Sequence, residues 1–266
     1  MVDDPRAELA SLSASLRAYL ELQRDSGATG VPRRVVVKPA ASVPVPASTS
    51  TSTSTSTNAN ANANASATPD RHVRLPQLAA EVAGCHKCVL GSTRTQTVFA
   101  RGNPDAQLCF VGEAPGADED AQGLPFVGRA GQLLDRMIAA MGLSPERDVY
   151  VCNIIKCRPP GNRRPEPDET EACIPYLHEQ IALVQPRVIV ALGNTSVAAL
   201  LEAKLGITKV RGQWKLYRGR TLVMPTYHPS YLLRPGPQQA ESKRQAWEDL
   251  QLVMKELGLS LPAKGS

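Results

Sequence analysis

Four polar side chains with catalytic potential follow short apolar segments of this 266-residue sequence. They are Glu113 after residues 107–112, Asn153 within residues 149–155, Asn194 after residues 187–192, and His228 after residues 221–225. Short apolar runs bounded by turn residues predict buried strands. Because the carboxyl ends of parallel strands meet at one edge of a sheet, we expect these four side chains to lie close together.

The loop that begins at Glu113 is the richest in chemistry. It holds further acids, Asp118, Glu119 and Asp120, and one isolated aromatic residue, Phe126. Long loops at the carboxyl end of a parallel strand are where α/β proteins place chemistry. The loop lacks a Gly-Lys-Ser/Thr ending, and its negative charge would repel phosphate, so it is not a nucleotide phosphate loop. The alternative is that its glycines turn the chain and its acids are solvated.

A flat polar ring attached to a phosphate backbone would suit these residues. Phe126 would stack on the ring, and the Asn153 amide would offer a donor and an acceptor to its edge. A lone histidine is more often structural, but the position of His228 at an equivalent strand end favours a functional role. Three arginines would contact phosphates or simply solvate their loop: Arg158, Arg163 and Arg164.

The six cysteines fall into two groups. Cys109 and Cys152 lie inside predicted strands, where they would act as small core hydrophobes. The other four lie in turns, in a loop or at the start of a helix: Cys85, Cys88, Cys157 and Cys173. Four thiolates are the set that a structural zinc ion or an iron–sulfur cluster binds. We expect a metal centre, and the spacing leaves zinc and iron–sulfur open.

Helices are predicted to alternate with the four strands. Apolar residues recur at spacings of three and four in residues 128–141 and 239–257, another helix starts near residue 167, and residues 197–201 form one that Asn194 or Thr195 would cap. This order predicts an α/β fold of three layers, αβα, around a central four-stranded parallel sheet. The basic segment 210–220 is expected to be an irregular or hairpin excursion.

Composition divides the chain into three parts. Residues 1–26 carry an amphipathic helix that would dock on its own domain or bind a partner protein, residues 27–70 are a low-complexity linker expected to be disordered, and residues 71–262 are long enough for one folded domain. The net charge of +5 permits nucleic-acid binding without demonstrating it. Neither a long apolar run nor an export signal is present, so we expect a soluble cytoplasmic protein that makes no contact with membranes.

Three segments resemble the family 4 uracil-DNA glycosylases, the iron–sulfur-containing type a enzymes. They are GEAPGADEDAQGLPFVGRAGQLL, VCNIIKCRPPGNRRPEP and YHPSYLLR, in this order and with matching spacing of the Cys pairs. The resemblance covers about residues 75–257. It implies the uracil-DNA glycosylase fold and base excision repair, in which uracil is flipped out of DNA and its N-glycosidic bond is hydrolysed.

The resemblance also implies roles for individual residues. A structural [4Fe-4S] cluster would be held by Cys85, Cys88, Cys157 and Cys173. Glu113 and Glu119 would be the catalytic acids, and His228 would hydrogen-bond uracil O2. Contacts to the substrate would come from Gly112, Ala114, Phe126, Asn153, Ser230 and Arg234. Tyr231, Leu232 or Leu233 would wedge into the gap left by the flipped nucleotide, unless the leucines are core residues.

Two other functions fit the same motifs. A related branch of the superfamily traps uracil-DNA covalently, but it carries Gln where this chain has Ala114 and a basic insertion that is absent here. A non-catalytic metal-centred module, of a DNA-binding or polymerase-associated kind, would bind DNA without excising a base. We expect a monomeric, nucleoid-associated enzyme that acts on uracil-containing DNA, with single- or double-strand preference left open.

Overall fold

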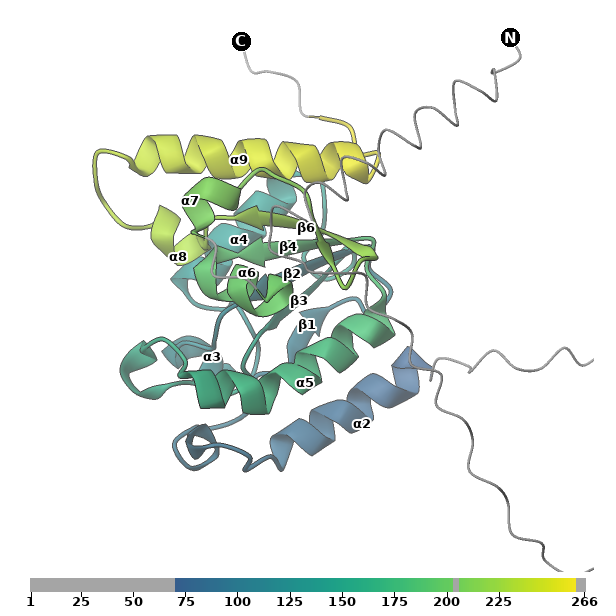
Figure 1. Ribbon diagram of the computed structural model, residues 1–266, viewed down its shortest axis with the longest axis vertical. Coiled ribbons are helices and arrows are strands. Elements are labelled where there is room, and N and C mark those ends of the chain that lie inside the picture. The colour runs from purple at the N-terminus through teal and green to yellow at the C-terminus, as the bar shows by residue number, and fades with distance from the viewer. Residues whose placement is uncertain (1–69, 203–205, 262–266) are drawn as a thin grey trace, which may run out of the picture. The chain divides into compact units, whose positions relative to one another are not determined.

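Six strands form one sheet in the part of the chain that the computed structural model describes, residues 70–202 and 206–261 (Figure 1). The strands are β1 (Ala100–Gly102), β2 (Leu108–Gly112), β3 (Val149–Asn153), β4 (Val188–Leu192), β5 (Lys215–Tyr217) and β6 (Thr221–Thr226). Their order across the sheet is β1-β3-β2-β4-β6-β5. The four central strands are parallel, and the two edge strands are antiparallel to their neighbours.

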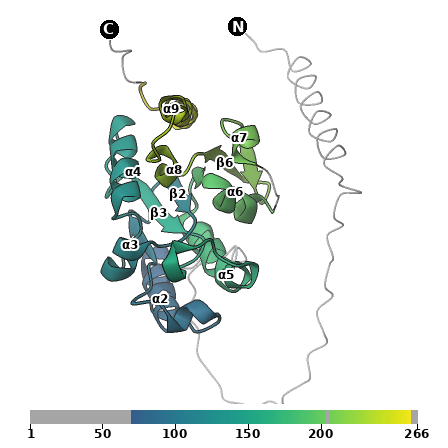
Figure 2. The same ribbon diagram turned by 90° about the vertical axis from the view of Figure 1, so that its left-hand side faces the viewer.

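Helices cover both faces of this sheet (Figures 1 and 2). They are α2 (Arg71–Ala83), α3 (Ala117–Gln122), α4 (Arg129–Ala140), α5 (Pro167–Val184), α6 (Gly193–Leu201), α7 (Ile207–Val210), α8 (Pro229–Leu232) and α9 (Gln239–Glu256), with 3-10 turns at Val89–Ser92 and Pro160–Asn162. Helices α4 and α9 share one hydrophobic core with the sheet, whereas α2, α5 and α6 share the core of the other face.

The alternation of side chains along β2 explains the three layers. Leu108 and Phe110 point into the core under α4 and α9, and Cys109 and Val111 point into the core under α2 and α5. Because both faces are covered, every residue of β2, β3 and β4 is buried, and each of these strands has the continuous apolar pattern of a parallel sheet. The predicted three-layer α/β fold and its four parallel strands are therefore confirmed.

Several elements differ from the sequence-based expectation. Strands β1 and β5 extend the sheet to six, and each has only three residues. Strand β1 was not expected, whereas β5 pairs antiparallel with β6 and agrees with the hairpin alternative for the segment 210–220. The acidic loop after β2 contains the short helix α3. Helix α6 begins at Gly193 and has no side-chain cap, so the predicted capping by Asn194 or Thr195 is wrong. No helix in the described residues is both long and apolar enough to cross a membrane.

The predicted N-terminal helix and all but the last residue of the predicted linker lie outside the described residues. Residues 70–202 and 206–261 belong to one compact unit of the chain. The boundaries predicted for three domains therefore stay a prediction, because only the last of these parts is described.

Candidate active site

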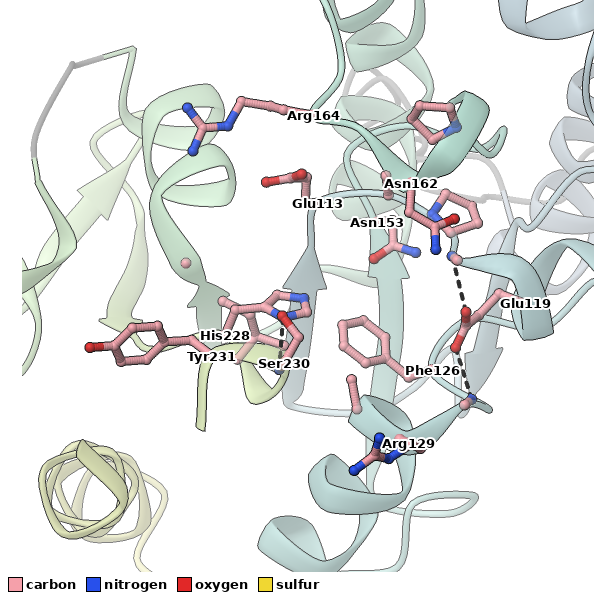
Figure 3. A pocket seen from close by; sticks show the side chains of 18 of the residues that line it. Glu113, Glu119, Phe126, Arg129, Asn153, Asn162, Arg164, His228, Ser230 and Tyr231 are labelled. Atoms are coloured by element: carbon pink, nitrogen blue, oxygen red, sulfur yellow. Dashed lines mark hydrogen bonds between the residues drawn. The ribbon is translucent and has the colours of Figure 1, made fainter. Parts of the chain in front are cut away.

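A cleft of about 830 Å³ opens at the carboxyl edge of the parallel strands (Figure 3). The strand ends are level, because Gly112 pairs with Asn153 and Leu192 pairs with Thr226. The loops that follow these residues therefore meet at one edge. Among the residues that line the cleft are Glu113, Ala114, Glu119, Phe126, Asn153, Asn194, His228, Ser230 and Arg234. The structure thus brings together side chains that are far apart in the sequence.

Phe126 forms one wall of the cleft, and two glycines make room for it. Its backbone is left-handed, with φ of 57°, and its side chain is 5% exposed. A Cβ on Gly131 would lie 1.8 Å from the Phe126 carbonyl oxygen, and a Cβ on Gly112 would lie 2.5 Å from the Phe126 ring. Gly112, predicted to contact substrate, is not among the cleft residues; it lets the ring and Asn153 approach β2 closely.

The backbone of Asn153 is hydrogen-bonded, but its side-chain oxygen has no partner among the described residues. The residue ends β3 and is 1% exposed, and among the described residues Oδ1 is a buried polar atom without a hydrogen bond. Its backbone carbonyl accepts a hydrogen bond of 2.6 Å from Lys156 Nζ, which also donates to Gln180 Oε1 on α5. A buried acceptor without a partner is costly, so Oδ1 is positioned to receive a donor from a ligand.

His228 faces Phe126 across the cleft, with ring centroids 5.6 Å apart. It is the N-cap of α8, and its Nδ1 accepts the backbone N–H of Ser230 at 3.1 Å. Because Nδ1 is an acceptor, the ring proton resides on Nε2. Burial, and the nearby charge of Arg234, lower the pKa of His228 to about 4, so the ring is neutral at physiological pH. Gly193, with φ of 87°, allows the backbone after β4 to pass close to the His228 Cβ.

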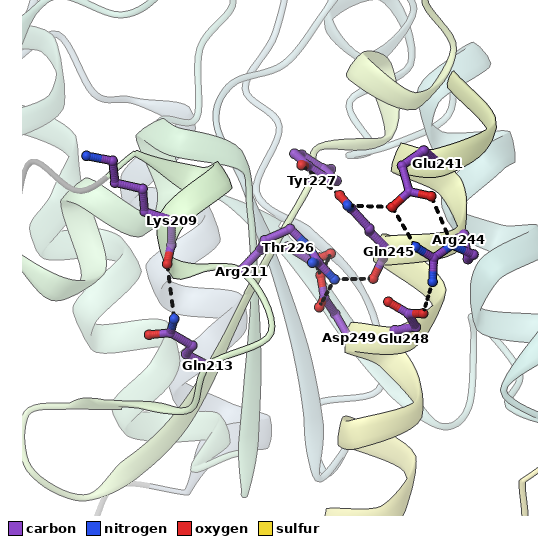
Figure 4. A network of polar contacts seen from close by, with 10 residues as sticks. All are labelled: Lys209, Arg211, Gln213, Thr226, Tyr227, Glu241, Arg244, Gln245, Glu248 and Asp249. Carbon is purple, nitrogen blue, oxygen red and sulfur yellow. Dashed lines mark hydrogen bonds and ion pairs between the residues drawn. The ribbon is translucent and has the colours of Figure 1, made fainter. Parts of the chain in front are cut away.

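A polar network behind His228 fixes the end of β6 (Figure 4). Thr226 Oγ1 donates to Asp249 Oδ2 at 2.7 Å, and Asp249 is 1% exposed and forms an ion pair with Arg211. The Tyr227 hydroxyl donates to Gln245 Oε1 at 3.0 Å. Helix α9 therefore holds the two residues that immediately precede His228.

The two candidate acids have different surroundings. Glu113 accepts a hydrogen bond from Thr195 Oγ1 at the start of α6. Glu119 is occupied by the backbone of its own loop, because Oε2 accepts Gly116 N–H and Oε1 accepts Val127 N–H and Gly128 N–H, all within 3.0 Å. Only Glu113 therefore has a carboxylate oxygen without a hydrogen bond from the described residues.

The remaining acids and the arginines around the cleft also divide by their partners. Asp120 is buried and accepts hydrogen bonds from Thr95. Arg163 lines the cleft, but both of its terminal nitrogens donate to the buried carboxylate of Glu169. Arg158 is not a cleft residue. Arg129, Arg164 and Arg234 also line the cleft. Of these, the sequence arguments assigned no role to Arg129, although it lies within the first of the three segments that carry the resemblance.

The four predicted metal ligands line one small cavity: Cys85, Cys88, Cys157 and Cys173. Arg94 Nη1 donates to Cys157 Sγ at 3.2 Å, and the Lys156 backbone N–H donates to Cys173 Sγ at 3.3 Å. Hydrogen bonds of this kind are typical of the sulfurs that hold an iron–sulfur cluster. In residues 70–202 and 206–261, no three His, Cys, Asp or Glu side chains converge closely enough for a single ion. Cys109 and Cys152 are buried in the core, as expected.

Comparison with known proteins agrees with this geometry. The family model described as the uracil DNA glycosylase superfamily matches residues 99–251. A type-4 uracil-DNA glycosylase of Thermotoga maritima is 46% identical over 65% of this chain and 90% of its own length, and one of Sulfurisphaera tokodaii is 48% identical over 60% and 76%. A type-5 uracil-DNA glycosylase of Thermus thermophilus is 31% identical over 68% and 91%. The chain belongs to the uracil-DNA glycosylase superfamily and, within it, to the type-4 enzymes.

Proposed function

We infer that this protein is a DNA repair glycosylase that removes uracil from DNA and leaves an abasic site. The observation that carries this inference is the unpartnered, buried Oδ1 of Asn153 beside the ring of Phe126, with a neutral histidine across the cleft. An extruded uracil supplies what this pocket lacks: a flat ring, an N–H donor for Asn153 and a carbonyl oxygen for His228.

Recognition of uracil would depend on Asn153. Uracil N3–H donates to Oδ1, and uracil O4 accepts from the side-chain amide. Cytosine offers an unprotonated N3 and an amino group at these positions, so both contacts would be mismatched in a site closed to water. Each unmet group would cost about 1 to 3 kcal/mol, which favours uracil over cytosine by at least tenfold.

Catalysis would rest on Glu113 and His228. Breaking the N-glycosidic bond develops positive charge on the sugar and negative charge on uracil O2. The Nε2–H of a neutral His228 would donate to O2 and become a stronger partner as that charge grows. The Glu113 carboxylate, oriented by Thr195, would stabilise the sugar cation and hold the attacking water. Glu119 would act through the loop whose backbone it binds.

DNA would lie across the cleft. Arg129, Arg164, Arg234 and Ser230 line the cleft and would bind phosphates on both sides of the extruded nucleotide. The small side chain of Ala114 would leave room for the substrate beside Glu113. These contacts would fix the register of the strand, whereas the base is read by Asn153.

The four cysteines would hold a [4Fe-4S] cluster, with zinc as the alternative. Cys85 and Cys88 follow α2, Cys157 follows β3, and Cys173 lies in α5. A metal centre here would therefore join three segments and stiffen the loop that follows Asn153. Iron and sulfide analysis with the visible absorption spectrum of the purified protein tests this choice, since a zinc protein is colourless.

The proposed setting is the cytoplasm, at the nucleoid, where a monomeric enzyme would meet its DNA substrate. The predicted N-terminal helix would bind a partner protein, and the predicted linker would let the helix do so at a distance from the glycosylase domain.

An alkali-cleavage assay on a uracil-containing oligonucleotide tests the function. Strand cleavage after incubation and alkali, absent with a thymine-containing control, is expected. Binding without abasic-site formation would favour a non-catalytic module, and a protein–DNA adduct that survives denaturing electrophoresis would favour covalent trapping.

A further inference from the structure

Tyr231 is an exposed aromatic residue that lines the cleft apart from Phe126 and Asn153. It lies in α8, three residues after His228, and is 37% exposed. Figure 3 shows its ring pointing away from Phe126 and Asn153. The next residue, Leu232, is only 2% exposed and packs in the core, so it is not available to contact DNA. Tyr231 is therefore the exposed ring of this loop.

The ring of Tyr231 is held in place by the ring of Tyr227. It stacks on Tyr227, with ring centroids 5.1 Å apart and planes 29° apart. The hydroxyl of Tyr227 is bonded to Gln245, and the guanidinium of Arg211 lies 5.8 Å from the Tyr227 ring. The Tyr227 ring is thus anchored to α9, and the Tyr231 ring that stacks on it is oriented before any ligand binds. A side chain that must enter a duplex as a wedge would have to leave this stack.

We propose that Tyr231 is a stacking site for the base next to the extruded uracil on the same strand. This inference rests on the proposed function and adds a second base-binding position to it. Aromatic side chains that extend a positively charged groove stack successive bases of single strands without reading their identity. Arg234, whose guanidinium is 6.0 Å from the Tyr231 ring, supplies the positive charge for the adjoining phosphate.

The preferred substrate class follows from this geometry. A neighbouring base in single-stranded DNA is free to turn onto Tyr231, whereas in a duplex it stays paired and stacked. Stacking of one base on an aromatic side chain changes affinity by about 5- to 150-fold. The Tyr231 site therefore favours uracil in single strands over uracil in duplexes.

Binding to oligonucleotides with a missing neighbour tests the proposal. The probes are single strands that carry 2′-fluoro-2′-deoxyuridine, which resists cleavage, with either normal flanking bases or a tetrahydrofuran abasic unit on the 5′ or the 3′ side. Dissociation constants are measured by fluorescence anisotropy for the unaltered protein, for Tyr231→Ala and for Tyr231→Phe. Leu216→Ala, which removes an exposed apolar side chain of β5 outside the cleft, is the matched control.

Tyr231→Ala is expected to weaken binding of the normal probe at least about fivefold, and Tyr231→Phe and Leu216→Ala to leave it unchanged. On one of the two abasic probes, the unaltered protein should bind more weakly than on the normal probe by the same factor. On that probe, Tyr231→Ala should not weaken binding further. An equal loss on all three probes would overturn the proposal, because Tyr231 would then act without the neighbouring base. If the unaltered protein did not excise uracil, the proposed function would be refuted instead. The binding measurements would still test the Tyr231 site, because they use a probe that is not cleaved.

Discussion

Glu113 and Glu119 belong to the same loop but are expected to fail differently when neutralised. Among the described residues, the Glu113 side chain has a hydrogen bond from Thr195, whereas Glu119 accepts three backbone N–H groups that shape the loop carrying Phe126. Glu113→Gln should therefore lower the single-turnover rate of uracil excision by about 100-fold or more with little change in melting temperature. Glu119→Gln should lower the melting temperature, because its amide presents a donor to backbone donors.

Single-turnover rates at saturating DNA, measured beside thermal melts of the same samples, separate these effects. Asp118→Asn, in the same loop, is the control for a general loss of negative charge. Comparable rate losses in Glu119→Gln without any change in melting would contradict the division of roles.

His228 should remain neutral far below the pH at which free histidine is protonated. Burial lowers its pKa to about 4 from the ordinary value of about 6.5. Since the folded-state pKa is the lower one, the unfolded chain takes up the proton first. His228 therefore reduces stability only as pH falls from about 6.5 to about 4, and has no such effect above that window. Nitrogen-15 NMR of the imidazole should show the Nε2–H tautomer at pH 6, and titration near pH 6.5 would contradict this.

Residue positions were more predictable than residue contacts. Placing Asn153 and His228 at one edge needed only the strand pattern and the rule that parallel strands end on one side. The capping role expected for Thr195 failed, because its hydroxyl bonds Glu113 from another strand end. The need for glycine at position 131 arises from contact with Phe126. Contacts of this kind depend on how distant segments pack, which no local pattern encodes.

At the scale of elements, β3 and α5 are joined by a buried lysine. Lys156 is fully buried, and its ammonium bonds the Asn153 carbonyl and Gln180 of α5. Lys156→Met would keep the volume but release that carbonyl, so the Asn153 amide, which we propose reads uracil, would lose its fixed position. We expect the single-turnover rate to fall about tenfold or more. The content of the proposed metal centre should stay unchanged, because the hydrogen bond to Cys173 comes from the backbone of Lys156; an unaltered rate at full metal content would contradict this role.

Helix α9 contributes to the site through the ion pair that anchors β6. Asp249→Ala would leave the half-buried Arg211 unpaired and Thr226 without its acceptor, at a cost of about 3 to 5 kcal/mol in the free energy of unfolding. Glu248→Ala is the matched control on the same helix, since its ion pair with Arg244 is exposed and should contribute less than about 1 kcal/mol. Urea unfolding measures both values, and equal midpoints would contradict the anchoring role.

The contrast between local patterns and distant contacts also explains which elements could be predicted. The five-residue strands β2, β3 and β4 are apolar except for Asn153 at the end of β3, and predicting them needed no tertiary information. Strand β1 carries no signal in its sequence, because its three residues become a strand only by pairing with β3. Strand β5 lies in the segment 210–220, for which the sequence left an irregular excursion and a hairpin open. Helix α3 is short and acidic, and it is stabilised by the contacts of Glu119 with its own N-terminus and with the loop after it.

At the scale of the whole molecule, the cleft and the four cysteines all lie within the described residues 70–202 and 206–261. The match to the family model begins at residue 99. Uracil excision should therefore need no residue before Asp70, which caps α2 by accepting the His72 N–H. A protein that starts at Asp70 is expected to excise uracil from an oligonucleotide at a rate within about twofold of the full chain.

Salt dependence sharpens the truncation experiment. Residues 1–69 have nearly balanced charge, so almost all of the positive excess of +5 belongs to the remaining chain. Because the slope of affinity against salt concentration reports the number of phosphates neutralised, the truncated and full proteins should share one slope. A smaller slope together with slower excision would mean that the N-terminal segment binds DNA directly. An equal slope with slower excision would mean instead that the predicted helix acts on its own domain, and neither outcome would fit a segment reserved for a partner protein.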